Sequence, residues 1–179
     1  AAIVLQPTQE NEKGILSTHL HSDGESAEIL AMFNPGTHAN YWLEQNLADF
    51  DDAEVGQMFM SHDMIDKAQN FPNMDGPAVV KFPEVIMEAL DKNGYKPSDI
   101  DLLIPHQANL RISQFVQQKL GLSNDKVFNN IDKYGNTTAA SIPLALSEAV
   151  EQGRIKKGDL LCMAAFGSGF TWASALVRW

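Results

Sequence analysis

A histidine and an asparagine are the residues whose type and setting could do chemistry. His106 follows the apolar run Ile100–Ile104 and Pro105, and Asn136 lies thirty residues further on in a loop of small residues. Each position marks a strand-to-helix junction, where α/β folds place ligand crevices. An imidazole N–H and an amide N–H aimed at one point form an oxyanion hole, which stabilises a developing enolate. The pair predicts such a site, although a core histidine and a turn asparagine would give the same pattern.

The lone thiol and a glycine turn are two further candidates. Cys162 lies in an apolar strand run, with no nearby cation or helix N-terminus to lower its pKa. We therefore expect a buried, inert cysteine and reject it as a nucleophile. The turn Gly167-Ser168-Gly169 could expose backbone N–H groups to a bulky ligand, because glycine permits close approach. It could equally be a tight turn and nothing more.

Two acidic or histidine-rich patterns could suggest a metal. His19, His21 and Asp23 recur at period two on one strand face, a spacing that could bind a divalent ion. The acidic cluster at residues 49–54 lacks the ligand pattern of a calcium loop and is typical of a solvated surface. A polar strand face explains the first pattern without a ligand. We predict no metal site and no cofactor.

Charge and composition exclude several classes of protein. Thirteen Lys and Arg against 23 Asp and Glu give a net charge of -10, the wrong sign for a nucleic-acid binder. Neither a run of about 18 apolar residues nor a signal peptide is present, which predicts a soluble, cytoplasmic protein. One cysteine cannot form an internal disulfide, consistent with a reducing compartment. Lys81, Arg111 and Lys119 form a local basic group that suggests an acidic partner, or simply a solvated face.

Strands alternate with helices along most of the chain. Residues 15–21 predict a half-buried strand with Leu16, Thr18 and Leu20 on one face and Ser17, His19 and His21 on the other. Periodicity and punctuation elsewhere predict strands at 100–104, 160–166 and 171–179, and helices at 77–93, at 112–120 and around 146–150. The pattern indicates an α/β layered domain with a mixed sheet. Residues 33–75 lack clear periodicity and form a long excursion.

Three segments together closely resemble the ketoacyl-acyl carrier protein synthase III family of condensing enzymes. They are residues 104–112 (IPHQANLRI), 134–141 (YGNTTAAS) and 165–178 (AFGSGFTWASALVR). The resemblance implies the C-terminal half of a thiolase-like fold, with a five-stranded mixed sheet flanked by helices. Residues 1–13 then match the last strand and loop of an otherwise missing N-terminal half, which accounts for a start at Ala1 with no initiator Met. Residues 14–179 match the C-terminal half, with its excursion at about 33–75.

The resemblance also implies an acyltransferase reaction. An acyl group passes from acyl-CoA to a cysteine in the missing half, and malonyl-acyl carrier protein then loses CO2 and attacks it. His106 and Asn136 would stabilise the enolate, and Phe166 would lie near the departing carboxylate. The backbone N–H of Ser168 would complete a second oxyanion hole. The fragment alone lacks the nucleophile, so we expect it to be inactive.

Binding residues follow from the same resemblance. Gly76, Ala108, Asn109 and Ile112 match positions that line the tunnel for CoA and carrier-protein pantetheine, while Lys81, Arg111 and Lys119 match the docking face for acyl carrier protein. The implied partners are acyl carrier protein, the missing N-terminal half and, in the complete enzyme, a second copy in a homodimer. Residues 74–80 differ from the family's usual tunnel lip, which leaves the primer length open.

Two alternatives stay open at this point. The chain could be a non-catalytic thiolase-like module that binds acyl carrier protein or a partner subunit. It could also be another thiolase-fold enzyme, such as a hydroxymethylglutaryl-CoA or polyketide synthase. The strings at 105–109 and 166–179 argue against the second of these.

Overall fold

A computed structural model describes residues 1–10, 13–26, 30–32, 58–60 and 77–179 of the chain. These separate into two compact units. The larger comprises residues 1–21, 77–166 and 172–179, and the smaller falls within residues 22–76 and 167–171. Most of the predicted excursion at 33–75 lies outside the described residues, and the predicted boundary after residue 13 stays a prediction. None of the described helices is both long and apolar enough to span a membrane.

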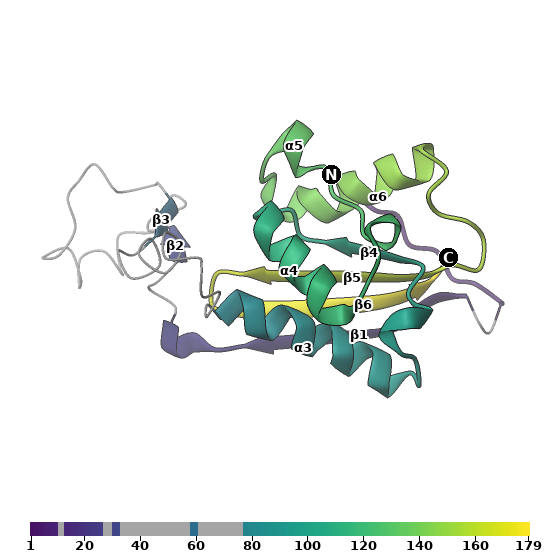
Figure 1. Cartoon of the computed structure of the whole chain (residues 1–179), viewed down its shortest axis with the longest axis horizontal. Coiled ribbons are helices and arrows are strands. Elements are labelled where there is room, and N and C mark those ends of the chain that lie inside the picture. Colours follow the sequence, from purple (N-terminus) through teal and green to yellow (C-terminus); the bar gives the residue numbers. More distant parts are fainter. Residues whose placement is uncertain (11–12, 27–29, 33–57, 61–76) are drawn as a thin grey trace, which may run out of the picture. The chain divides into compact units, whose positions relative to one another are not determined.

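The larger unit is built on a four-stranded sheet (Figure 1). Its strands, in spatial order, are β1 (Gly14–Ser22), β6 (Thr171–Arg178), β5 (Leu160–Gly167) and β4 (Leu102–Pro105). Strands β4 and β5 are parallel, with Leu102 opposite Leu161 and Pro105 opposite Ala164. Only three residues join β5 to β6, so this neighbouring pair forms an antiparallel hairpin. The predicted mixed sheet is confirmed. In the smaller unit β2 (Leu30–Met32) pairs antiparallel with β3 (Met58–Met60).

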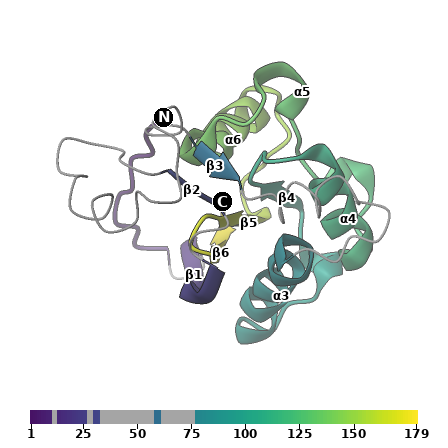
Figure 2. The ribbon, with the colours of Figure 1, turned by 90° about the vertical axis from the view of Figure 1, so that its left-hand side faces the viewer.

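Helices cover both faces of the large sheet (Figure 2). They are α3 (Pro77–Lys92), α4 (Leu110–Leu120), α5 (Ile131–Tyr134) and α6 (Ser141–Glu151). Helices α3 and α4 pack side by side on one face, and α6 covers the other. The predicted helical segments are confirmed, including the end of α4 at Gly121, whose φ of 67° is a left-handed conformation that suits glycine.

Alternation along β4 distributes its side chains between the two layers. Leu102 and Ile104 belong to a core cluster with Ala145 and Ala149 of α6. Successive strand residues face opposite sides, so Leu103 points towards α3 and α4. All four strand residues are buried, as expected of a strand covered on both faces. The residue that follows this buried strand, His106, therefore lies at the carboxyl edge of the sheet.

The strand count is one lower than predicted. The described residues contain four strands in the large sheet, and Val127 adds only an isolated parallel bridge to Leu103. The strand that the resemblance implies within residues 1–13 is also not formed by residues 1–8, which have no regular structure. Ile3, Val4 and Leu5 are exposed there. A strand needs a neighbour for its backbone groups, and in the described part of the chain this segment pairs with none.

The face of β1 that carries the leucines is not the one that packs against α3. Thr18 and Leu20 are exposed, and Leu20 retains 74% of its accessible surface. The opposite face, which carries Ser17 and His19, is the one in contact with α3, where Asn93 at the end of the helix donates to the Ser17 hydroxyl over 2.7 Å. Polar contacts fix this face, so the alternation of apolar residues identified the strand but not its orientation.

Candidate active site

His106 lies immediately after β4, at the edge where the parallel strands end. Its backbone N–H donates to the carbonyl of Ala164 on β5 over 2.8 Å, which extends the β4–β5 ladder by one residue. Its side chain is half-buried, and Nδ1 lies 2.6 Å from the hydroxyl oxygen of Ser141, the first residue of α6. Burial lowers the pKa of the imidazole below its ordinary 6.5. The ring is therefore neutral at pH 7, and its position is fixed from two elements.

Asn136 lies in the loop between α5 and α6, five residues before Ser141. Its side-chain oxygen accepts from the backbone N–H of Thr138 over 2.9 Å, and the side chain is exposed. This contact identifies the oxygen end of the amide, so Nδ2 is the end left to donate. Thr138 has a φ of 52°, a costly conformation for a β-branched residue. The loop runs from Asn136 to Ser141 at the start of α6, and Ser141 contacts the His106 ring. The asparagine is therefore connected through α6 to the histidine.

The buried side chain of Gln107 holds the turn after β4 against the start of α5. The side chain is 3% exposed, and its amide donates to the carbonyl of Pro105 over 2.7 Å. Its oxygen accepts from the backbone N–H groups of Asn130 and Ile131 at 3.0 and 3.2 Å. These bonds attach the turn after β4 to the segment that starts α5, which leads to Asn136. Sequence reasoning missed this residue because the two N–H groups that its oxygen accepts from belong to backbone more than twenty positions away.

Phe166 reaches the same edge of the sheet from β5, two residues beyond the partner of Pro105. It is buried and stacks on Trp172 of β6, with ring centroids 6.4 Å apart. Trp172 in turn stacks on His21 of β1, so one face of the sheet carries a row of rings across three strands. Trp172 has no pattern in the sequence that would have pointed to this stacking role. Ser168 belongs to the smaller unit, where its carbonyl accepts from the Thr171 hydroxyl over 2.9 Å.

Three of the predicted tunnel residues lie in the turn after His106 and at the start of α4. Asn109 caps α4, because its side-chain oxygen accepts from the backbone N–H of Arg111 over 2.9 Å. Ala108 and Ile112 flank this cap and are half-buried. Gly76 lies outside the described residues. The structure gives Asn109 a capping role and leaves the tunnel assignment a prediction.

The predicted basic group spans two packed helices. Arg111 and Lys119 are exposed on α4, while Lys81 lies on α3. Lys81 forms an ion pair with Glu84 over 3.0 Å, and its ammonium lies 5.3 Å from the ring centre of Trp172. The Glu84 contact offsets part of its charge. Arg111 and Lys119 are the more accessible cations of the three.

Comparison with known proteins decides the family. Residues 90–179, just over half of the chain, match the family 3-oxoacyl-[acyl-carrier-protein (ACP)] synthase III C terminal. The chain belongs to this synthase III family. The predicted resemblance is thereby confirmed, and His106, Asn136 and the β5–β6 hairpin all lie inside the matched region.

Relatives and solved structures extend the synthase III likeness over nearly the whole chain. Beta-ketoacyl-[acyl-carrier-protein] synthase III of Caldanaerobacter subterraneus is 41% identical over 95% of this chain and 47% of its own length. That of Alkalilimnicola ehrlichii is 41% identical over 99% of this chain and 49% of its own length. The crystal structure of the Aquifex aeolicus synthase III has a TM-score of 0.74 at 37% identity, over 96% of this chain and 46% of that one. The chain thus spans about half the length of the relatives it matches.

Cys162 of this synthase III chain lies inside β5. Its side chain is fully buried, and burial raises the pKa of the thiol to about 12. The expectation of a buried cysteine is confirmed. A thiol that is neither ionised nor accessible cannot act as a nucleophile at neutral pH.

The native chain should therefore resist thiol reagents. We expect Cys162 to react with a maleimide only after denaturant is added, because both access and thiolate formation require unfolding. Mass spectrometry of the labelled protein measures this. Ser147→Cys, at an exposed position of α6, provides a matched control that should label in the native state. Rapid native labelling of Cys162 would contradict the assignment of an inert thiol.

His19 and His21 both contact one carboxylate, that of Glu88. Glu88 of α3 lies 3.3 Å from Nδ1 of His19 and 2.6 Å from Nε2 of His21. The hydrogen bond with His21 holds the pKa of Glu88 below its ordinary 4.5. Across the described residues, no three His, Cys, Asp or Glu side chains are arranged to hold a metal ion. Asp23 instead accepts from the backbone N–H of Glu25 over 3.0 Å.

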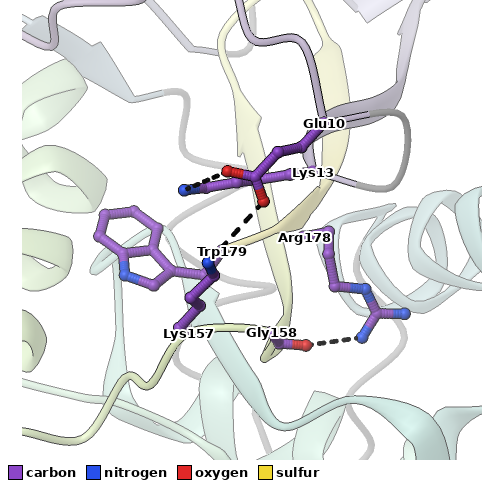
Figure 3. A pocket seen from close by; sticks show the side chains of 6 residues that line it. All are labelled: Glu10, Lys13, Lys157, Gly158, Arg178 and Trp179. Carbon is purple, nitrogen blue, oxygen red and sulfur yellow. Dashed lines mark hydrogen bonds and ion pairs between the residues drawn. The ribbon is translucent and has the colours of Figure 1, made fainter.

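Figure 3 shows a pocket whose lining residues do not include His106. Glu10 lies 3.9 Å from both Lys13 and Lys157 there, and Arg178 donates to the carbonyl of Gly158 over 2.9 Å. Gly158 precedes β5, so the pocket marks the amino end of the parallel pair, whereas His106 follows the carboxyl end of β4. The pocket therefore contributes nothing to the candidate site.

Glu148 of α6 holds the helix that leads to Asn136. Its carboxylate accepts from Lys133 and from the side-chain amide of Asn130, the latter over 2.9 Å. The Lys133 hydrogen bond, followed by that from Asn130, holds the pKa of Glu148 below its ordinary 4.5. Because the folded pKa is the lower one, the carboxylate's contribution to stability is complete above pH 4.5 and is lost as pH falls through the folded value.

Removing this charge should flatten the acid dependence of stability. We expect Glu148→Gln to lower the urea midpoint at pH 7. Between pH 5 and pH 3, the midpoint of this variant should fall by less than the midpoint of the wild type. Glu151→Gln, at an exposed position of the same helix, should leave the urea midpoint at pH 7 and its fall between pH 5 and pH 3 almost unchanged. Equal acid dependence in Glu148→Gln and the wild type would mean that other groups set the profile.

Proposed function

We propose that this chain supplies the decarboxylating side of the active site in a cytoplasmic ketoacyl-acyl carrier protein synthase III. The reaction joins an acyl-CoA primer to malonyl-acyl carrier protein. The observation that carries the proposal is a neutral, half-buried His106 fixed at the carboxyl edge of a thiolase-like sheet, in a chain of the synthase III family. The names of the relatives that span about twice its length support the same reaction.

The chemistry assigned to this side is loss of CO2 from the malonyl group. The bond between the malonyl carboxylate and its α-carbon breaks, and the electron pair moves onto the thioester oxygen as an enolate. His106 Nε2–H and Asn136 Nδ2–H donate to that oxygen and stabilise its charge. The α-carbon then attacks the acyl-cysteine thioester, forms the new carbon–carbon bond and expels the cysteine thiolate.

Further residues complete the proposal. Phe166 provides an apolar ring beside the carboxylate, which favours its departure as neutral CO2, and the backbone N–H of Ser168 stabilises the second oxyanion. Ala108, Asn109 and Ile112 line the pantetheine tunnel. Lys81, Arg111 and Lys119 attract acyl carrier protein by charge. As the family resemblance implies, the nucleophilic cysteine lies in an N-terminal half; the buried, un-ionised state of Cys162 supports this assignment.

The complete protein that contains this chain provides the test. With acetyl-CoA or longer primers and malonyl-acyl carrier protein, it should release CO2 and form ketoacyl-acyl carrier protein, and it should elute as a homodimer. The isolated chain should form no product. A complete protein that binds acyl carrier protein but yields neither CO2 nor ketoacyl product would be a non-catalytic module instead.

A further inference from the structure

The hydroxyl of Ser141 joins the turn after β4 to the start of α6. It lies 2.6 Å from His106 Nδ1 and accepts from the backbone N–H of Gln107 over 3.4 Å. The residue is 2% exposed. In the part of the chain that the structure describes, these are its only side-chain hydrogen bonds. Ser141 is the last residue of the segment 134–141, and no role was predicted for it from the sequence.

Counting protons on these groups selects one arrangement. The Gln107 N–H can only donate, so the Ser141 oxygen must accept it. If His106 Nδ1 also donated to that oxygen, the hydroxyl proton would need another acceptor, and among the described residues there is none. At 2% exposure, solvent offers no substitute, and an unused buried donor is costly. The hydroxyl must therefore donate to a bare Nδ1.

We propose that Ser141 is a positioning residue, which holds His106 in the Nε2–H tautomer and so presents a proton donor to the site. A neutral imidazole carries one N–H, and occupying Nδ1 as an acceptor places that proton on Nε2. Nε2 has no partner among the described residues, and no buried side-chain nitrogen or oxygen there lacks one, so Nε2 lies at the accessible surface. The consequence for catalysis rests on the proposed function, whereas the tautomer does not.

The tautomer can be measured in the 179-residue chain itself. Long-range proton–nitrogen NMR of the ¹⁵N-histidine-labelled protein distinguishes the two neutral forms, and loss of signals in His106→Gln assigns His106 among the five histidines. We expect the Nε2–H form above the imidazole pKa. A wild-type His106 in the Nδ1–H form would overturn the proposal without any mutation of Ser141.

Two variants of nearly identical shape isolate the hydroxyl. Ser141→Thr keeps it and Ser141→Val replaces it with a methyl group, so any strain from branching is common to both. We expect Nε2–H in Ser141→Thr and a mixture of tautomers in Ser141→Val. Ser147→Ala, at an exposed position of α6, should leave the His106 signals unchanged. Identical tautomers in the Thr and Val variants would refute a role for the hydroxyl.

The complete enzyme adds a second measurement. Ser141→Val should reduce kcat for malonyl decarboxylation by up to about 10²-fold, with Ser141→Thr retaining most of it, because an oxyanion donor is lost in the first variant only. If the proposed function is wrong, the wild type itself will not decarboxylate, and the NMR result will still stand. A tautomer change with unaltered kcat would refute the positioning role.

Discussion

His106→Ala and Asn136→Ala should each lower malonyl decarboxylation by the complete enzyme by about 10²-fold or more. Each substitution removes one of two N–H donors to the enolate oxygen, and loss of a single oxyanion donor costs about 3–4 kcal/mol of transition-state stabilisation. The effect should fall on kcat, with little change in KM, because the charge develops only in the transition state. Release of labelled CO2 from malonyl-acyl carrier protein measures the step directly.

Controls separate this effect from misfolding. Asn124→Ala alters an exposed asparagine in another turn and should keep wild-type decarboxylation. The double variant of His106 and Asn136 should lose much less than the product of the two single losses, because the donors act on one oxygen. Wild-type rates in either single variant would remove that residue from the site.

Gln107→Leu should cost the chain about 2–4 kcal/mol of stability, the largest effect we expect from a single side chain outside the hydrophobic core. Leucine has a similar size but no hydrogen-bonding groups. Its introduction leaves the Pro105 carbonyl and the N–H groups of Asn130 and Ile131 without the amide partner. Urea unfolding followed by circular dichroism measures the loss.

The matched control for this prediction is Gln118→Leu, at an exposed position of α4. Its free energy of unfolding should stay within about 0.5 kcal/mol of the wild-type value, as surface substitutions do. A Gln107→Leu variant as stable as Gln118→Leu would show that water or a rearranged loop satisfies the same groups. The buried amide would then be incidental to the fold.

Local patterns in the sequence were sufficient to predict most elements of the larger unit. Periodicity identified α4, and glycine marked its end. Both signals are local, because they depend on residues no more than about four positions apart. The buried run before Pro105 identified β4, and the position of His106 followed from it. These predictions needed no knowledge of distant contacts.

Long-range polar contacts were beyond the reach of the same reasoning. The face of β1 that meets α3 depends on Glu88 and Asn93, some seventy residues away, and no apolar pattern encodes that choice. Gln107 and Ser141 were missed for the same reason, because a glutamine or serine in a loop has no periodic signature. The roles of Phe166 and Ser168 came from resemblance alone.

The bonds of Gln107 have a consequence for variation in this region. The glutamine recognises the backbone of Asn130 and Ile131, not their side chains. Substitutions at Ile131 that preserve the chain path should therefore leave the turn that carries His106 undisturbed. Protein engineers who wish to alter the surface around α5 have a position to randomise there, whereas Gln107 itself should tolerate almost no replacement.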